Sequence, residues 1–195
     1  MGAAAPTITS GPLIGYVKHT KPPTLEDRTP GTFVGGVVGA VAANPTGRDI
    51  VVNNAIQDPS GDMAHEIATA YATKRGGHVA DAPLLDDHSR TQSDLLASQA
   101  GGARYIVDVE PPWMTLVYFS FDWAHFDLMY VSRVRVIETA DGKVVAQAGC
   151  FLRSEKTPGA LTGDELLANS AAALKQLIVR KSEACVALMK TGLAL

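Results

Sequence analysis

The 195-residue sequence has little of what marks a nucleic-acid-binding or membrane-spanning protein. Its formal net charge is −3, and its one basic cluster of note is Arg133 with Arg135. A nucleic-acid surface needs clustered lysine and arginine side chains that displace counterions from phosphates, so we expect no nucleic-acid partner. The longest nearly unbroken apolar run, residues 32–43, is about 12 residues long, whereas a membrane-spanning helix needs about 20.

Catalytic and cofactor-binding motifs are also missing. The sequence contains no GxSxG, HExxH, GxGxxG or GxxxxGKS/T pattern, so neither a nucleophilic hydrolase nor a phosphate-binding loop is indicated. Asp86, Asp87 and His88 place three potential ligands in a row. We favour a solvated turn there, and a metal or catalytic role is the alternative. We therefore predict no catalytic residue, no cofactor and no metal, and favour a protein that is not an enzyme.

Residues 1–47 differ in composition from the rest of the chain. They hold six of the 11 prolines together with many glycine, threonine and alanine residues, which predicts an extended, poorly structured arm. Within it, Gly31, Gly35 and Gly39 form a small-xxx-small pattern that lets helices approach closely. We favour a short helix or loop packed on the domain. The alternative is a glycine zipper that inserts into a membrane or drives self-association.

Residues 48–195 have the periodicity of a single folded domain. The expected elements are a strand at 50–56, a helix from 59 to 76, a strand at 78–82, a helix from 91 to 101, strands at 105–110, 114–121, 126–138 and 144–151, and a helix from 162 onward. The last helix opens on a capping box from Thr162 to Glu165. The order is β-α-β-α, then an antiparallel β-meander and a long C-terminal helix packed on one face of the sheet. This is an α+β fold.

The only cysteines are Cys150, at the end of an expected strand, and Cys185, on the apolar face of the last helix. Both side chains would point into the same helix–sheet interface, either as two buried thiols or as a disulfide, which we favour. A disulfide would close a loop of about 35 residues and stabilise the domain by roughly 4 kcal/mol. It would also indicate an oxidising compartment. The start of the chain lacks the features of a signal peptide, which leaves a cytosolic protein or the mature part of an exported one.

Aromatic residues gather in one part of the sequence, between residues 113 and 130. One interpretation is core packing with a buried hairpin tip. The other is an interaction surface, because aromatic side chains anchor interfaces; its predicted members are Trp113, Phe121, Trp123, His125 and Asp127. In a strand, His125 and Asp127 would project from the same face.

An ordered set of segments carries a resemblance to a known group. The segments are residues 54–59, 121–126, 130–137, 142–150 and 164–169, the last lying ahead of Cys185. Over roughly residues 45–190 the chain resembles a group of uncharacterised Gram-negative envelope lipoproteins. The order of its elements is also similar to small α/β domains of envelope assembly lipoproteins, such as the curli-secretion lipoprotein and the penicillin-binding-protein activators, a fold-level analogy that carries no function by itself.

The resemblance implies a periplasmic domain tethered to a membrane by an N-terminal lipid on an upstream cysteine. With no catalytic motif present, we predict a non-enzymatic protein-interaction or assembly module. Its partner would be an unidentified envelope protein, with homo-oligomer formation left open. The alternative is a small-ligand- or metal-binding enzyme that uses the region of His125 and Asp127.

Overall fold

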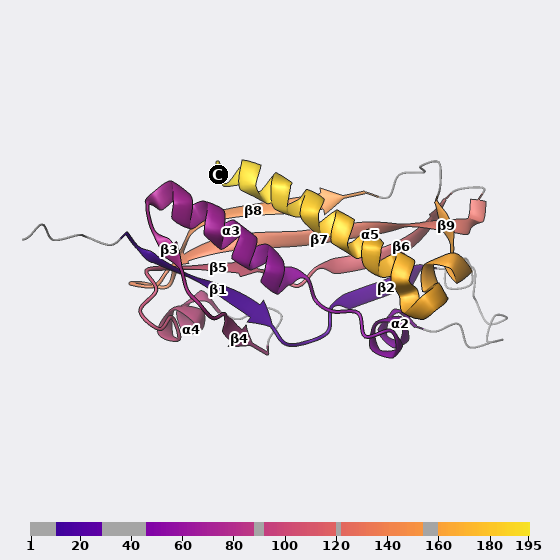
Figure 1. Cartoon of the computed structure of the whole chain (residues 1–195), viewed down its shortest axis with the longest axis horizontal. Coiled ribbons are helices and arrows are strands. Elements are labelled where there is room, and N and C mark those ends of the chain that lie inside the picture. Colours follow the sequence, from indigo (N-terminus) through magenta and orange to yellow (C-terminus); the bar gives the residue numbers. More distant parts are fainter. Residues whose placement is uncertain (1–10, 29–45, 88–91, 120–121, 154–159) are drawn as a thin grey trace, which may run out of the picture.

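The computed structural model describes residues 11–28, 46–87, 92–119, 122–153 and 160–195. These residues form a nine-stranded mixed sheet with helices on both of its faces (Figure 1). The strands are β1 (Leu13–His19), β2 (Thr24–Arg28), β3 (His78–Val79), β4 (Leu84–Asp86), β5 (Tyr105–Val109), β6 (Trp113–Phe119), β7 (Asp122–Glu138), β8 (Lys143–Leu152) and β9 (Leu161–Thr162). The helices are α2 (Gly47–Asn53), α3 (Ser60–Arg75), α4 (Ser93–Ser98) and α5 (Gly163–Gly192).

Strand β7 organises the sheet, whose main path runs β2-β6-β7-β5-β1-β3. On one side, β7 pairs antiparallel with β6 through its first half and with β5 through its second. On its other side it pairs with β9 and then with β8, both antiparallel. The parallel pairs are β1 with β3, β4 and β5, and β2 with β6.

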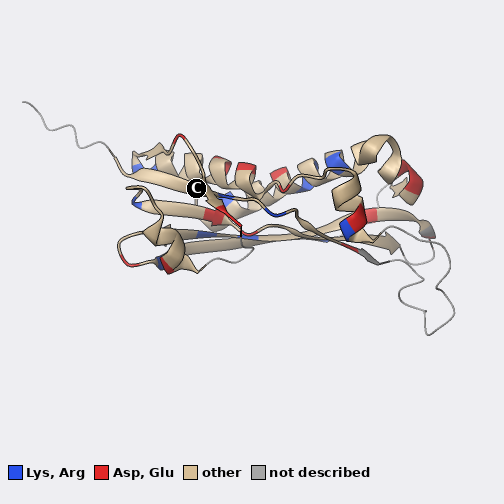
Figure 2. Cartoon of the chain, turned by 90° about the horizontal axis from the view of Figure 1, so that it is seen from below, with Lys and Arg blue, Asp and Glu red and all other residues tan. Residues whose placement is uncertain are grey.

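Helices α3 and α5 cover one face of the sheet, which we call the inner face (Figures 1 and 2). The core between the two layers contains Ile14 from β1, Tyr130 from β7, Ile67 from α3 and Leu174 from α5, all fully buried. Burying each aliphatic side chain contributes about 1.5–3 kcal/mol, so this interface is the main source of stability. None of the helices in the described residues has the length and apolarity needed to cross a membrane.

Local sequence signals account for one end of each of the two long helices. The Thr162 hydroxyl accepts a hydrogen bond from the Glu165 amide at 3.3 Å, and the Glu165 carboxylate accepts one from the Thr162 amide at 2.8 Å. The predicted capping box is therefore confirmed. Helix α3 ends at Gly76, whose φ of 63° lies in the left-handed region that glycine adopts without strain.

The opposite, outer face is covered at one end by α4. Leu96 of α4 packs on Val17 of β1, Ile106 of β5 and Ile137 of β7, and these four side chains form a second, smaller apolar cluster. The predicted fold class is confirmed: the sheet contains the antiparallel strands β6, β7 and β8, and a long C-terminal helix packs on one of its faces.

The expected strand at residues 50–56 is wrong. Helix α2 spans Gly47–Asn53 instead, and Thr46 and Asp49 form a capping box at its start. Ile50 and Val51 are buried while Val52 is exposed, as on one face of a short helix. A short run of β-branched residues fits a strand and a helix equally well, and here the capping box decides in favour of the helix.

The prediction of a poorly structured arm is wrong for β1 and β2, which lie within residues 1–47. β1 is an interior strand of the sheet, and its Ile14 and Val17 are fully buried on opposite faces. The prolines that suggested an arm include Pro22 and Pro23, which lie in the short link between the two strands. The first strand of the fold is therefore β1. Gly31, Gly35 and Gly39 lie outside the described residues.

Candidate functional site

The outer face of the sheet carries a groove where α4 does not reach. Its volume is about 530 Å³. It is lined by Glu110, Pro111, Trp113, Val131, Ser132, Arg133, Gly149, Cys150 and Phe151. We call it the outer-face groove. Its residues come from β6, β7, β8 and the link between β5 and β6.

Strand register explains why these side chains meet. Trp113 of β6 lies opposite Val131 of β7, which in turn lies opposite Phe151 of β8. Side chains in such cross-strand positions lie about 5 Å apart, so the three form a continuous apolar row across three strands. Trp113 and Phe151, the two ends of this row, are 36% and 51% exposed, so both aromatic rings are accessible from solvent.

The next row along the sheet forms the hollow and supplies charge. Arg133 of β7 lies opposite Gly149 of β8, whose missing side chain leaves space beside Phe151. Among the described residues, no ion pair to Arg133 is formed. The Arg153 guanidinium lies 5.5 Å from the centre of the Phe151 ring, at cation–π distance. An exposed apolar row flanked by two arginines can receive an apolar side chain that is accompanied by a carboxylate.

The predicted interaction surface is only partly brought together. His125 and Asp127 precede Val131 on β7 by up to six residues, so His125 lies about 20 Å along the strand from the groove. Phe121 and the Trp123 side chain lie outside the described residues. Trp113 is thus the predicted member that lines the groove, and whether these residues bind a partner stays a prediction.

His125 and Asp127 are engaged with different partners. The His125 Nδ1 atom lies 2.7 Å from Asp122 Oδ1, and the Lys181 ammonium group of α5 donates to Asp127 Oδ2 at 3.1 Å. His125 and Asp127 therefore make two separate contacts, with Asp122 and Lys181, and do not pair with each other. Among the residues that the structure describes, no group of three or more His, Cys, Asp or Glu side chains could hold a metal ion.

The predicted disulfide is confirmed. Cys150 of β8 and Cys185 of α5 are bonded, with their Cα atoms 5.3 Å apart, and both residues are buried. The bond joins the strand that borders the outer-face groove to the helix on the opposite face of the sheet.

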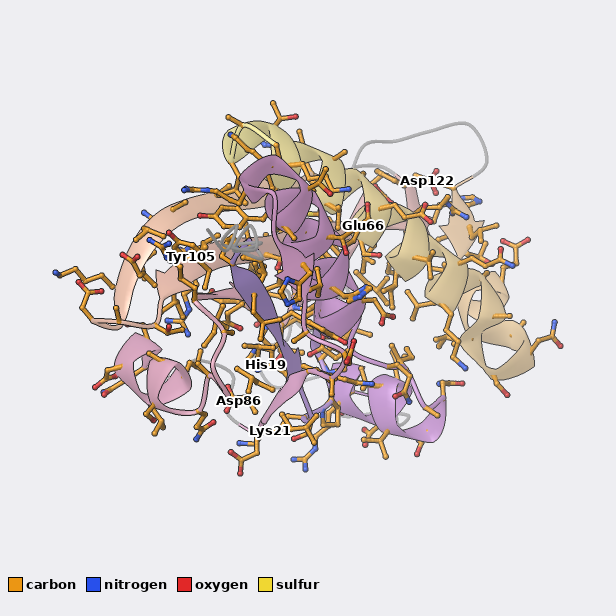
Figure 3. The ribbon with its side chains drawn as sticks, turned by 60° about the vertical axis from the view of Figure 1, so that its left-hand side comes forward. His19, Lys21, Glu66, Asp86, Tyr105 and Asp122 are labelled. Atoms are coloured by element: carbon orange, nitrogen blue, oxygen red, sulfur yellow. A yellow bond between two sulfur atoms is a disulfide. The ribbon has the colours of Figure 1, made fainter. Side chains whose placement is uncertain are left out.

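A buried polar cluster lies beside the groove and was missed by the sequence analysis. His19 of β1 faces a carboxylate at each ring nitrogen: Nε2 lies 3.0 Å from Asp108 Oδ1, and Nδ1 lies 3.4 Å from Asp86 Oδ2. Arg135 of β7 donates to the second Asp108 oxygen at 2.7 Å. Figure 3 shows His19 and Asp86 close together at the end of β1. A protonated His19 would give this cluster two cations and two carboxylates.

The signal that could have indicated this cluster is Asp108, the one charged residue of β5, whose other four residues are apolar or aromatic. A charge on a fully buried strand requires partners. Asp86, predicted to lie in a solvated turn, is instead buried in β4 as one of those partners, so that prediction is wrong for Asp86. Asp87 is exposed beyond the strand, and His88 lies outside the described residues.

No family model matches this chain, and no curated protein matches it in sequence. Solved structures that are similar to this chain include proteins from Gram-negative bacteria. PelC from Paraburkholderia phytofirmans, a dodecamer, is 13% identical and covers 98% of this chain and 95% of its own, with a TM-score of 0.34.

Two further structures show the same low level of similarity. Lipoprotein GNA1162 from Neisseria meningitidis is 12% identical, covering 87% of this chain and 94% of its own at a TM-score of 0.31. A DUF330 protein from Xanthomonas campestris is 15% identical, covering 93% and 86% at a TM-score of 0.33. The neighbours thus include a lipoprotein of the class that the sequence resembles. At these TM-scores they carry no argument about function or assembly.

Proposed function

We propose that this chain is a non-enzymatic module of the Gram-negative cell envelope that binds a partner protein through the outer-face groove. The observation that carries the proposal is the row formed by Trp113, Val131 and Phe151. At this end of the sheet no described helix covers the row, although α3 and α5 close the opposite face. Exposed aromatic side chains in a hollow are typical anchors of protein interfaces.

The charges around the groove indicate the chemistry of the partner. Arg133 and Arg153 border the apolar row on the side of β7 and β8, and Glu110 lies at the end of β5. A complementary segment would place an apolar side chain against Gly149 and a carboxylate near Arg133. Arginine binds carboxylates through two parallel hydrogen bonds, which adds orientation to the contact.

The envelope location rests on the disulfide and on the resemblance in sequence. Disulfides persist in oxidising compartments such as the periplasm and are rare in the cytosol. In this proposal, a lipid on an upstream cysteine anchors the domain to the membrane. Thiol alkylation inside cells, followed by mass spectrometry, tests the location. We expect Cys150 and Cys185 to be protected from the reagent, and two alkylated thiols would contradict it.

Site-specific photocrosslinking tests the groove in the native envelope. The photoreactive residue p-benzoylphenylalanine replaces Phe151 in the full chain, produced in the organism that encodes it. Mass spectrometry distinguishes a crosslink to another protein from one between two copies of this chain. We expect one dominant crosslinked species that contains another protein, and we expect Arg133→Glu in the same chain to remove it, because the change reverses the charge beside the row.

A matched control uses an exposed apolar residue elsewhere on the molecule. Leu85 of β4 is 67% exposed and does not line the groove. The same photoreactive residue at position 85 should give no such species. Equal crosslinking from positions 85 and 151, or crosslinking that survives Arg133→Glu, would overturn the groove as the binding site.

The alternative function, a ligand- or metal-binding enzyme at His125 and Asp127, is favoured by no observation of the site. Each of the two side chains is held by a different neighbour, Asp122 for His125 and Lys181 for Asp127. We therefore keep the interaction module as the single proposal.

A further inference from the structure

Strand β8 lies at the rim of the sheet and has one free edge among the described strands. It pairs antiparallel with β7 along its whole length, from Leu152 opposite Tyr130 to Lys143 opposite Glu138. No described strand pairs with its other side, and Figure 1 shows β8 as the outermost strand beyond β7. An edge strand presents a row of unpaired backbone N–H and C=O groups that another strand can use.

The free edge of β8 lacks most of the features that prevent edge-to-edge pairing. Proteins protect their edges with proline, inward-pointing charges, bulges or very short strands. β8 contains no proline, and its one charged residue, Lys143, is its first residue and is paired with Asp141. A register shift leaves Val145 as an extra residue between Ala146 and Val144. This bulge limits the regular part of the strand to residues 146–152, all of which are uncharged.

We infer that β8 pairs antiparallel with β8 of a second copy of this chain, with Gly149 of one copy facing Gly149 of the other. Gly149 is the midpoint of residues 146–152, so this register pairs the regular segment over its full length. Phe151 then lies opposite Gln147 of the second copy, where the ring packs on the aliphatic part of the glutamine side chain. The two copies are related by a two-fold axis through Gly149, so each of these contacts forms twice, once from each copy.

Helix α5 adds apolar surface beside the same edge. Ala184 lies with Leu152 and Arg153 in a second groove, between the end of β8 and α5. Leu188 lies one helical turn further on the same face of α5 and is 48% exposed. In the paired arrangement, Leu188 of each copy extends the contact behind the two strands. The grooves on the outer face would then lie next to each other across the two-fold axis.

Charge exchange at Gly149 tests the register directly. A Cβ atom at this position would meet only the Ser132 carbonyl oxygen, at 3.6 Å, which is ordinary van der Waals contact. Side chains are therefore accommodated in the single copy. Gly149→Lys and Gly149→Glu each place like charges opposite one another across the axis, whereas an equimolar mixture of the two places opposite charges there.

Sedimentation velocity of the oxidised full chain over an approximately hundredfold concentration range gives the readout. We expect wild type and Gly149→Ala to shift from the 20.5 kDa monomer to a dimer as concentration rises. Gly149→Lys and Gly149→Glu alone should stay monomeric, and their mixture should dimerise. A wild type that is monomeric throughout, or a mixture that stays monomeric, would overturn the inference. Dimerisation of the mixture also shows that both variants are folded.

This inference goes beyond the proposed function and fails separately from it. Trp113 lies on β6, two strands from the free edge of β8. Trp113→Ala should therefore abolish crosslinking to the partner protein without changing sedimentation. If the dimer is absent while crosslinking at position 151 persists, the groove stands and only the pairing of β8 is wrong.

Discussion

The two faces of the sheet are closed in different ways. On the inner face, α3 and α5 bury a large apolar core that includes Leu174 and Tyr130, and a disulfide crosses the interface. On the outer face, α4 buries a small apolar cluster, and the cluster of His19, Asp108 and Arg135 lies beside the open groove.

This difference separates the parts of the chain that hold the fold from those available for binding. Apolar burial has no directional requirement. The inner face therefore depends on the area that α3 and α5 cover and not on specific pairs of side chains. The polar cluster on the outer face needs each partner in place because buried charges are costly when unpaired. It thereby fixes β1, β5 and β7 next to a surface that stays exposed.

The largest expected effect comes from breaking the polar cluster. Asp108→Ala leaves Arg135 and His19 without their shared carboxylate, and we expect a loss of about 3–5 kcal/mol in the free energy of unfolding. Urea denaturation followed by circular dichroism measures it. The control is Asp141→Ala, which removes an exposed ion pair with Lys143 and should change the free energy of unfolding far less. Equal effects of the two variants would contradict the structural role of the cluster.

A second comparison removes one large apolar side chain from each face. Leu174→Ala on the inner face should lower the free energy of unfolding by about 3 kcal/mol, because it leaves a cavity in the core. Phe151→Ala on the outer face should change it by about 0.5 kcal/mol or less, since half of that side chain is already exposed. The same denaturation experiment measures both changes. A large loss in the free energy of unfolding from Phe151→Ala would mean that the groove is part of the core.

The disulfide crosses the helix–sheet interface on the inner face. Replacing both Cys150 and Cys185 by alanine should lower the free energy of unfolding by about 2–4 kcal/mol, mainly by freeing the unfolded chain. Thermal unfolding with and without a reducing agent checks this. Reduction of the wild type should reproduce the loss and should leave the double variant unchanged. A wild type that is indifferent to reduction would contradict the prediction.

The smallest effect concerns a carboxyl group at the start of α3. Burial raises the pKa of Asp58 above its usual value of 3.8, and the hydrogen bond from the Ser60 amide opposes this shift only in part. Below the usual pKa, Asp58 is protonated in both the folded and the unfolded protein. As the pH rises, Asp58 loses its proton more readily in the unfolded chain than in the folded chain. Ionisation of Asp58 therefore disfavours folding at neutral pH.

Asp58→Asn keeps the oxygen that accepts from the Ser60 amide and removes the charge. We expect it to stabilise the protein slightly at neutral pH, with the gain narrowing as the pH falls toward 4. Denaturation curves at several pH values measure the gap between variant and wild type. A gain that is independent of pH would show that the charge of Asp58 is not its cause.

Elements with local signals could be predicted from the sequence. The capping box at Thr162 marks the start of α5, and the alternating and β-branched residues of β6 to β8 indicate the meander. The disulfide followed from the same patterns, because they place Cys150 and Cys185 on facing surfaces. By contrast, β1 is buried on both faces and therefore shows no simple alternation. It is also followed closely by prolines, and its partners lie more than 50 residues away in β3, β4 and β5.

The candidate site depended on information that the sequence does not display. Trp113 was predicted as part of an interaction surface, but its neighbours Val131 and Phe151 follow from strand register, which short-range patterns leave open. His19 and Asp108 are 89 residues apart, and they meet because β1 and β5 pair in parallel, with Asp108 facing the same side of the sheet. No local pattern predicts such a pairing.

The bond between Cys150 and Cys185 also determines how the rim of the sheet moves. Outermost strands usually detach first, so their amides exchange with solvent sooner than those of interior strands. Here the outermost strand cannot peel away without carrying α5 with it. While the sulfur atoms are joined, β8 is held as a fixed template for a second strand, and in a thiol-rich environment the same segment would become the first to unravel.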